Sequence, residues 1–223
     1  MIVYHGSEQM IEQPVLGGGK ATNDYGRGFY TTEHEALAKE WACARGNDGY
    51  ANRYQLDLNG LKVLNLNAGE YNILNWLAVL TRHRSYWQNS SISEEAKRYL
   101  QDHFYVNTDR YDIIIGYRAD DSYFTFAQDF VANTISLDTL RMAMHLGELG
   151  EQIVLKSRKA FQCIQFLGSE PALAETYFDE KTNRDLEARR AYREARTHTR
   201  TTDGIYMIDI MREGMTDGDP RLQ

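Results

Sequence analysis

The order of the expected helices and strands is the feature that most restricts the fold of this chain. Strands are expected at residues 2–5, 29–31, 53–58, 62–66, 112–116, 152–156 and 161–167, and helices at 33–44, 71–81, 93–103, 124–131, 137–146, 171–196 and 203–211. Few strand–helix–strand units in this irregular order could be parallel. The order therefore predicts a mixed α+β fold rather than a doubly wound sheet.

Local signals place several element ends. An Asn-Gly pair at residues 59–60 predicts a tight turn between the third and fourth strands. Thr32, Ser93 and Ser136 are the expected N-caps of three helices, with Glu35 in the capping-box position after Thr32. No boundary between domains is expected before about residue 170.

Composition excludes several protein classes. A hydrophobic fraction of 42% and a charged fraction of 26% over 223 residues are typical of a globular protein. No run of apolar residues is long enough to span a membrane, and the N-terminus lacks the pattern of a secretory signal. Two distant cysteines, Cys43 and Cys163, are expected to be reduced and buried. The cytoplasm is the expected compartment, with no membrane partner.

Charge is unevenly distributed along the chain. The net charge of −7 disfavours non-specific binding of nucleic acid by the whole surface. Residues 181–200, however, hold seven basic residues against three acidic ones. Helical spacing places Arg189, Arg193, Arg196 and Arg200 in one stripe. The stripe is either a solvated face or a docking surface for RNA, DNA or an acidic partner.

The first candidate site is the sequence YHGS at residues 4–7. His5 ends an expected strand, and Gly6 would let a ligand approach the backbone closely. A histidine that is satisfied within a turn is the alternative interpretation.

The second candidate site is the sequence YGRGFYTT at residues 25–32. Its paired glycines alone are a weak phosphate-binding signal. Tyr30 precedes a helix, and Trp41 follows eleven residues later on an inward face of that helix. Two aromatic faces at this spacing could hold a planar ring between them. Alternatively, Trp41 is part of the core.

The third candidate site is the sequence ELGEQIV at residues 148–154. Glu151 precedes an apolar strand, where it is positioned to face a pocket or simply to lie at the surface. Gln152 is adjacent, and strand alternation sends the two side chains to opposite faces. Only one of them can face the pocket; Glu151 is preferred and Gln152 is its rival.

Together, these motifs resemble the ADP-ribosyltransferases of the diphtheria-toxin and poly(ADP-ribose) polymerase type, whose His, Tyr and Glu lie on three separate strands. The closest resemblance is to an uncharacterised bacterial family of that superfamily. It covers residues 1–168, with unmatched insertions at about 68–145. It implies a split mixed β-sheet core with helical insertions, a catalytic domain at residues 1–170 with a helical insertion at about 70–145, and a helical C-terminal extension at 171–223 packed on or next to it.

The resemblance also implies a set of site residues and a co-substrate. NAD would be the co-substrate, with no metal. Glu151, His5 and Tyr30 would be catalytic, with Gln152 as the rival of Glu151. The residues expected to bind NAD are His5, Gly6, Ser7, Arg27, Gly28, Tyr30, Thr31 and Trp41.

The implied activity is cleavage of the bond between nicotinamide and ribose, followed by transfer of ADP-ribose to a protein or nucleic acid. By association with the family, the chain would be a toxin held by an antitoxin or immunity protein, or a phage-defence effector. Two alternatives stay open. One is an NAD glycohydrolase, and the other is a silent module that keeps the fold and binds NAD without turnover.

Overall fold

A computed structural model describes residues 1–85, 90–119, 121–148, 150–198 and 204–222 of the chain. The fold is α+β, with two sheets and eight α-helices in the described residues. The three-stranded sheet has the order β1 (Ile2–Ser7), β3 (Gly49–Leu56), β7 (Ile164–Ala172). The four-stranded sheet has the order β2 (Phe29–Thr31), β6 (Glu151–Leu155), β5 (Ile113–Tyr117), β4 (Val63–Asn65). β4 and β5 run parallel, and the other neighbouring strands are antiparallel.

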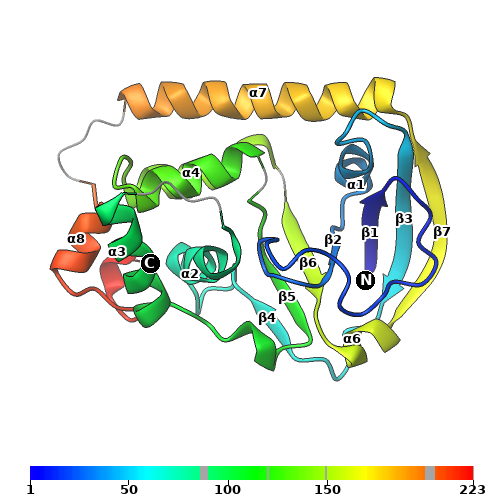
Figure 1. The fold of residues 1–223 in the computed structure, drawn as a ribbon, viewed down its shortest axis with the longest axis horizontal. Coiled ribbons are helices and arrows are strands. Elements are labelled where there is room, and N and C mark those ends of the chain that lie inside the picture. The colour runs from blue at the N-terminus through cyan, green and yellow to red at the C-terminus, as the bar shows by residue number, and fades with distance from the viewer. Residues whose placement is uncertain (86–89, 120, 149, 199–203, 223) are drawn as a thin grey trace.

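The helices divide between the two sheets. Their bounds are α1 (Glu35–Ala42), α2 (Ile73–His83), α3 (Ser91–His103), α4 (Asp121–Val131), α5 (Leu137–Met144), α6 (Arg158–Gln162), α7 (Ala174–His198) and α8 (Met207–Arg212). Figure 1 shows α1 beside the three-stranded sheet, and α2, α3, α4 and α8 gathered beyond the four-stranded sheet. The long helix α7 lies along one side of the molecule and reaches from α1 to α4.

The larger hydrophobic core lies in this group of helices, which we call the helical body. Nine consecutive residues of α2, from Ile73 to Thr81, are buried. Trp76 is fully buried among them, and its indole N–H donates to the carbonyl of Tyr117 at 3.1 Å. A helix buried on every face is typical of the centre of a core rather than of its surface. The helical body therefore forms around α2.

The C-terminal segment packs into the helical body. Tyr192 of α7 donates its hydroxyl to Asp129 of α4 at 2.7 Å, and Arg196 pairs with the same carboxylate at 3.1 Å. Met207, Ile210 and Leu222 belong to the larger core. Described parts of α7, α8 and the C-terminal segment thus pack with the helices between residues 73 and 144.

Several expected element ends are wrong. Helix α1 is preceded by His34 rather than capped by Thr32. Thr32 cannot serve as the cap because its backbone is bonded to Tyr4 in a β-bridge. Helix α3 is capped by Ser90 and not by Ser93, whereas the cap of Ser136 on α5 is confirmed.

Two further expectations need correction. The Asn59-Gly60 turn is present, with Gly60 at φ +73°, but β3 and β4 on either side of it belong to different sheets. Residues 161 and 162, expected to begin a strand, belong to the short helix α6, whose cap Ser157 accepts a hydrogen bond from the N–H of Ala160. A strand pattern is indistinguishable from a short helix over so few residues.

Candidate functional site

The two sheets meet at one β-bridge and separate beside it. Tyr4 of β1 and Thr32 exchange backbone hydrogen bonds at 2.7 and 2.9 Å. Two residues further, the antiparallel register would pair Gly6 with Tyr30. There, instead, Nδ1 of His5 lies 2.7 Å from the carbonyl oxygen of Tyr30. The imidazole of His5 therefore takes the place of the backbone hydrogen bond that Gly6 would make to Tyr30, and the two sheets diverge from this point.

Gly6 lies at the start of this divergence. Backbone groups two residues apart point to the same side of a strand. Since Tyr4 bonds Thr32, the N–H and C=O of Gly6 also point toward β2. A Cβ atom at position 6 would lie 1.9 Å from the carbonyl oxygen of Ala38, so only glycine allows α1 to pack this closely on β1. The result is a strand edge whose donor and acceptor face the space between the sheets.

His5 is partly buried and held in one tautomer. Its ring packs against Phe29, with centroids 4.3 Å apart. A carbonyl oxygen can only accept, so Nδ1 carries the proton and Nε2 of the neutral ring is an acceptor. Burial lowers the pKa of His5 below its usual range, which favours this neutral form.

His5 lines the first of three adjoining cavities. This loop cavity, of about 500 Å³, lies between His5, Phe29 and Tyr30 on one side and the loop at residues 11–19 on the other. Gly28 also lines it.

Tyr30 presents its ring and not its hydroxyl. The hydroxyl donates to the carbonyl of Gly26 at 2.6 Å and accepts from the N–H of Tyr25 at 3.0 Å. Burial raises the pKa of Tyr30 well above its usual range, so the phenol stays protonated at neutral pH. With its hydroxyl satisfied, the side chain offers a flat apolar face.

The second cavity, which we call the ring cavity, has a volume of about 180 Å³. Tyr30, Trp41 and Gln152 line it together. Gln152 is 7% exposed, and among the described residues its amide oxygen has no hydrogen-bond partner. The sequence therefore singled out three residues that meet on one cavity wall.

Glu151 points away from this wall. Its carboxylate accepts a hydrogen bond from the side-chain amide of Asn67 at 2.8 Å, and the residue does not line the ring cavity. In the structure Gln152, the rival candidate, lines the ring cavity in place of Glu151. The two residues do lie on opposite faces of β6, as alternation requires. The register of β6 with β2, in which Thr31 faces Ile153, determines which face is which.

The ring cavity also contains charged residues that the sequence reasoning missed. Asp24 is 3% exposed and forms an ion pair with Arg84 at 2.7 Å. Its carboxylate also accepts a hydrogen bond from the backbone N–H of Ala119 at 2.8 Å. Arg118 places its guanidinium 4.1 Å from the centroid of the Trp41 ring. These residues are far apart in the chain, and the only available signal was that Arg118 follows a buried strand.

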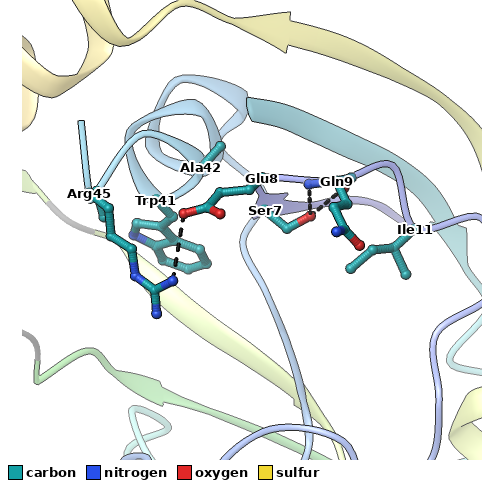
Figure 2. A pocket seen from close by; sticks show the side chains of 8 residues that line it. Ser7, Glu8, Gln9, Ile11, Trp41, Ala42 and Arg45 are labelled. Atoms are coloured by element: carbon teal, nitrogen blue, oxygen red, sulfur yellow. Dashed lines mark hydrogen bonds and ion pairs between the residues drawn. The ribbon is translucent and has the colours of Figure 1, made fainter. Parts of the chain in front are cut away.

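The third cavity lies at the end of β1 and has a volume of about 380 Å³. We call it the Glu8 cavity. Ser7, Glu8 and Ile11 form one wall, and Trp41 and Arg45 form the other. Figure 2 shows Glu8 and Arg45 pointing toward each other beside Trp41, with a carboxylate–guanidinium distance of 3.6 Å.

The three cavities share wall residues. Trp41 lines both the ring cavity and the Glu8 cavity, and Ile11 lines both the Glu8 cavity and the loop cavity. Tyr30 and Asn23 line both the ring cavity and the loop cavity. The three cavities therefore adjoin one another, and we refer to them together as the cleft.

Gly6 and Glu151 line none of the three cavities, and the same holds for Arg27 and Thr31. Arg27 is exposed and donates to the carbonyls of Gly17 and Gly19, at 3.1 and 3.3 Å. Thr31 is fully buried, and its hydroxyl donates to the carbonyl of Ile153 at 2.8 Å. Both residues hold the backbone together instead of lining a cavity.

The arginine stripe on α7 is partly paired within the chain. Arg189 donates to Asp185 at 2.8 Å, and Arg196 pairs with Asp129 at 3.1 Å. Arg193 is exposed. Arg200 lies outside the described residues.

The described ranges contain neither a cluster of metal ligands nor a membrane-spanning helix. Within the described ranges, no group of three or more His, Cys, Asp or Glu side chains could hold a metal ion. In the same part of the chain, no helix is both long and apolar enough to cross a membrane.

Comparison with known proteins gives one match. A family profile described as "Protein of unknown function (DUF3990)" matches residues 1–166. No curated protein and no solved structure matches the chain. The matched range contains every residue of the cleft named above and ends before α7.

Proposed function

The chain belongs to the DUF3990 family, and we propose that it binds NAD along this cleft, cleaves the bond between nicotinamide and ribose, and transfers ADP-ribose to a macromolecule. One observation carries the proposal. The side chain of Gln152 lines a cavity together with two aromatic side chains, and its buried amide oxygen has no partner among the described residues. Buried polar atoms are normally hydrogen-bonded, so an exception on a cavity wall indicates a ligand.

The nicotinamide end fits the ring cavity and the edge of Gly6. A carboxamide has one acceptor oxygen and an NH₂ donor, and the C=O and N–H of Gly6 complement both. Tyr30 and Trp41 would hold the ring, because aromatic faces pack on planar rings with an additional gain of about 0.5–1.5 kcal/mol. The amide oxygen of Gln152 would accept a hydrogen bond from a ribose hydroxyl.

The adenosine end fits the loop cavity. A volume of about 500 Å³ lies within the usual range of ligand pockets. Nε2 of His5 would accept a hydrogen bond from a ribose hydroxyl, because Nδ1 already donates its proton to the carbonyl of Tyr30. The divergence of the two sheets at Gly6 also supports the resemblance to the ADP-ribosyltransferases, whose fold has a split sheet.

When bound, NAD supplies a leaving group that is already activated, because the nicotinamide nitrogen carries a positive charge. The chain orients the two ends and stabilises positive charge that develops on the ribose. Gln152 can do this only through the dipole of its amide oxygen, which stabilises positive charge less than a carboxylate would. The neutral Gln152 therefore favours a second candidate function, an NAD-binding module without turnover.

Incubation of the purified chain with labelled NAD tests the proposal and separates the candidates. We expect release of nicotinamide and, with whole-cell lysate, label in a macromolecule. Nicotinamide release without such label would indicate a glycohydrolase, and NAD binding without release would indicate the silent module. Gln152→Ala should reduce release by roughly 10²-fold, the usual effect of removing one stabilising group. The matched variant Glu151→Ala should lose far less, and the reverse order would refute the assignment of Gln152.

A further inference from the structure

The outer side of α7 has no role in binding NAD as described above. The helix packs on α1, α4 and α5 with one side, and no described element covers the opposite side (Figure 1). Six exposed residues follow one another along this opposite side at intervals of four and three: Glu175, Asp179, Thr182, Leu186, Arg189 and Arg193. We call these six residues the α7 seam. Residues at such intervals lie in one line on a helix and are the ones that meet in a pair of helices.

The charges of the α7 seam are divided between its two halves. Glu175 and Asp179 make the N-terminal half acidic, and Arg189 and Arg193 make the C-terminal half basic. Neither Asp179 nor Arg193 forms an ion pair with another described residue. Arg189 pairs with Asp185 at 2.8 Å, but the side chain of Arg189 is 45% exposed, so this pair contributes little to stability. Most of the charge on the seam is therefore available to a partner.

An apolar side chain lies between the two charged halves. Leu186 is 57% exposed, and Phe178, which lies beside the seam, is 39% exposed. Removal of such apolar surface from water is favourable. A partner that covers the middle of the seam would therefore gain free energy from Leu186 as well as from the charges at both ends.

A second copy of the chain, with its α7 running antiparallel, matches this order of charges. In a pair centred between residues 182 and 186, Glu175 of one copy lies opposite Arg193 of the other. Asp179 lies opposite Arg189 in the same arrangement. Each of these contacts occurs twice, because a two-fold axis relates the copies.

Other occupants meet charge of the wrong sign at one end of the α7 seam. A nucleic acid or a uniformly acidic peptide would be repelled by Glu175 and Asp179. A parallel second copy would place each charged residue opposite its own equivalent. The division of charge therefore favours the antiparallel copy over these three occupants.

We propose that two copies of the chain associate through their α7 seams as a symmetric antiparallel dimer. Leu186 of each copy packs against Thr182 of the other at the centre. The dimer does not depend on the proposed function, because no residue of the seam lines the cleft. A contact between single helices is smaller than a stable interface of about 1,200–2,000 Å², so the dimer dissociates on dilution.

Sedimentation velocity of the full chain over a range of concentrations tests the dimer. We expect the mass to rise with concentration from the 25.8 kDa of one chain toward twice that value. Raising the salt concentration to about 1 M shortens the screening length to about 3 Å and should shift the equilibrium toward the monomer. A chain that stays monomeric up to about 1 mM, a concentration at which even weak specific complexes form, would overturn the inference. A dimer that is insensitive to salt would also overturn it.

Charge reversal tests whether the α7 seam is the contact. Arg193→Glu and Glu175→Arg should each raise the dissociation constant of the dimer at least tenfold, because each places like charges opposite each other. An equimolar mixture of the two variants, or both changes in one chain, should restore association, since opposite charges then face each other again.

Arg158→Glu is the matched control for the change in net charge. Arg158 is exposed at the start of α6, which lies on the other side of the molecule from α7 (Figure 1). This variant should associate as the wild type does. Equal dissociation constants for Arg158→Glu and Arg193→Glu would place the contact elsewhere and overturn the inference. Failure of the mixed variants to associate would exclude the antiparallel arrangement.

Discussion

Two buried carboxamide side chains distinguish the helical body from the cleft. Asn75 of α2 is fully buried, and its amide donates to the carbonyl of Phe104 and to Asp217, both at 2.9 Å. Its oxygen accepts the N–H of Asn72 at 2.8 Å. Gln152 of β6 is almost as buried, yet its oxygen has no partner in the described part of the chain.

This difference in hydrogen bonding suggests a structural role for Asn75 and a ligand-binding role for Gln152. A buried amide with all its bonds made stabilises the fold, because each missing partner would cost free energy. A buried amide that faces a cavity with its oxygen unpaired adds little to stability and is available to a ligand. We therefore expect substitutions in the helical body to change the free energy of unfolding and substitutions in the cleft to change binding.

The largest expected effect is that of Asn75→Ala. It leaves the carbonyl of Phe104 and the N–H of Asn72 without their partner, and it removes one of two donors to the exposed carboxylate of Asp217. Unpaired buried groups each cost about 1–3 kcal/mol, so we expect a loss of about 2–4 kcal/mol of unfolding free energy in urea denaturation. A loss of unfolding free energy below about 1 kcal/mol would show that the side-chain amide of Asn75 matters no more to stability than that of Gln152.

Tyr192→Phe should have a smaller effect in the same region. It removes the hydroxyl that donates to Asp129, while Arg196 still pairs with that carboxylate. We expect a loss of about 1–2 kcal/mol, since a hydrogen bond to a charged group is removed but no charge is left unpaired. The same denaturation series measures it, and no change at all would show that α7 is not part of the cooperative unit.

His5 should make stability depend on pH through the cleft. Burial lowers its pKa in the folded chain, so the unfolded chain binds more protons between that value and the ordinary pKa of about 6.5. Stability contributed by neutral His5 is therefore present above the ordinary pKa and is lost as pH falls through this window. His83, which is next to Gly26, has a pKa lowered by burial and adds to the same loss.

The variant His5→Asn isolates the contribution of His5. An asparagine amide can still donate to the carbonyl of Tyr30 but does not titrate. Urea denaturation at pH 7.5 and at pH 5 should show a smaller acid loss in this variant than in the wild type. An identical loss would mean that His5 is not the titrating group.

The smallest expected change in stability is that of Gln152→Leu. Replacing a buried polar group that lacks a partner by an apolar one of similar shape is nearly neutral, so the unfolding free energy should change by less than about 1 kcal/mol. NAD binding measured by calorimetry should nevertheless weaken at least tenfold. A destabilisation as large as that of Asn75→Ala would assign Gln152 a structural role.

The sequence allowed part of this cleft to be predicted because the signals are local. His5, Tyr30 and Trp41 each follow from a strand end, a turn or a helical spacing. The structure places Tyr30 and Trp41 on one cavity and His5 on the adjoining one. The α+β class followed from the irregular order of elements.

The remaining features depend on contacts between distant parts of the chain. Asp24, Arg84 and Arg118 lie on three separate segments, and no spacing predicts that they meet. Alternation predicted that Glu151 and Gln152 oppose each other, but only the pairing of β6 with β2 determines which one faces the cavity. For the same reason, the turn at residues 59–60 was predictable and the separation of β3 from β4 was not.

The most direct test of the central claim compares the two amides in one experiment. Side-chain amides of Gln and Asn and the backbone amide of Gly6 give separate signals in a ¹⁵N correlation spectrum of the labelled chain. On addition of NAD, we expect the signals of Gln152 and Gly6 to shift in a saturable manner, while that of Asn75 stays in place. Saturation of the protein with NAD without a shift of Gln152 or Gly6, or no binding at millimolar NAD, would contradict the account.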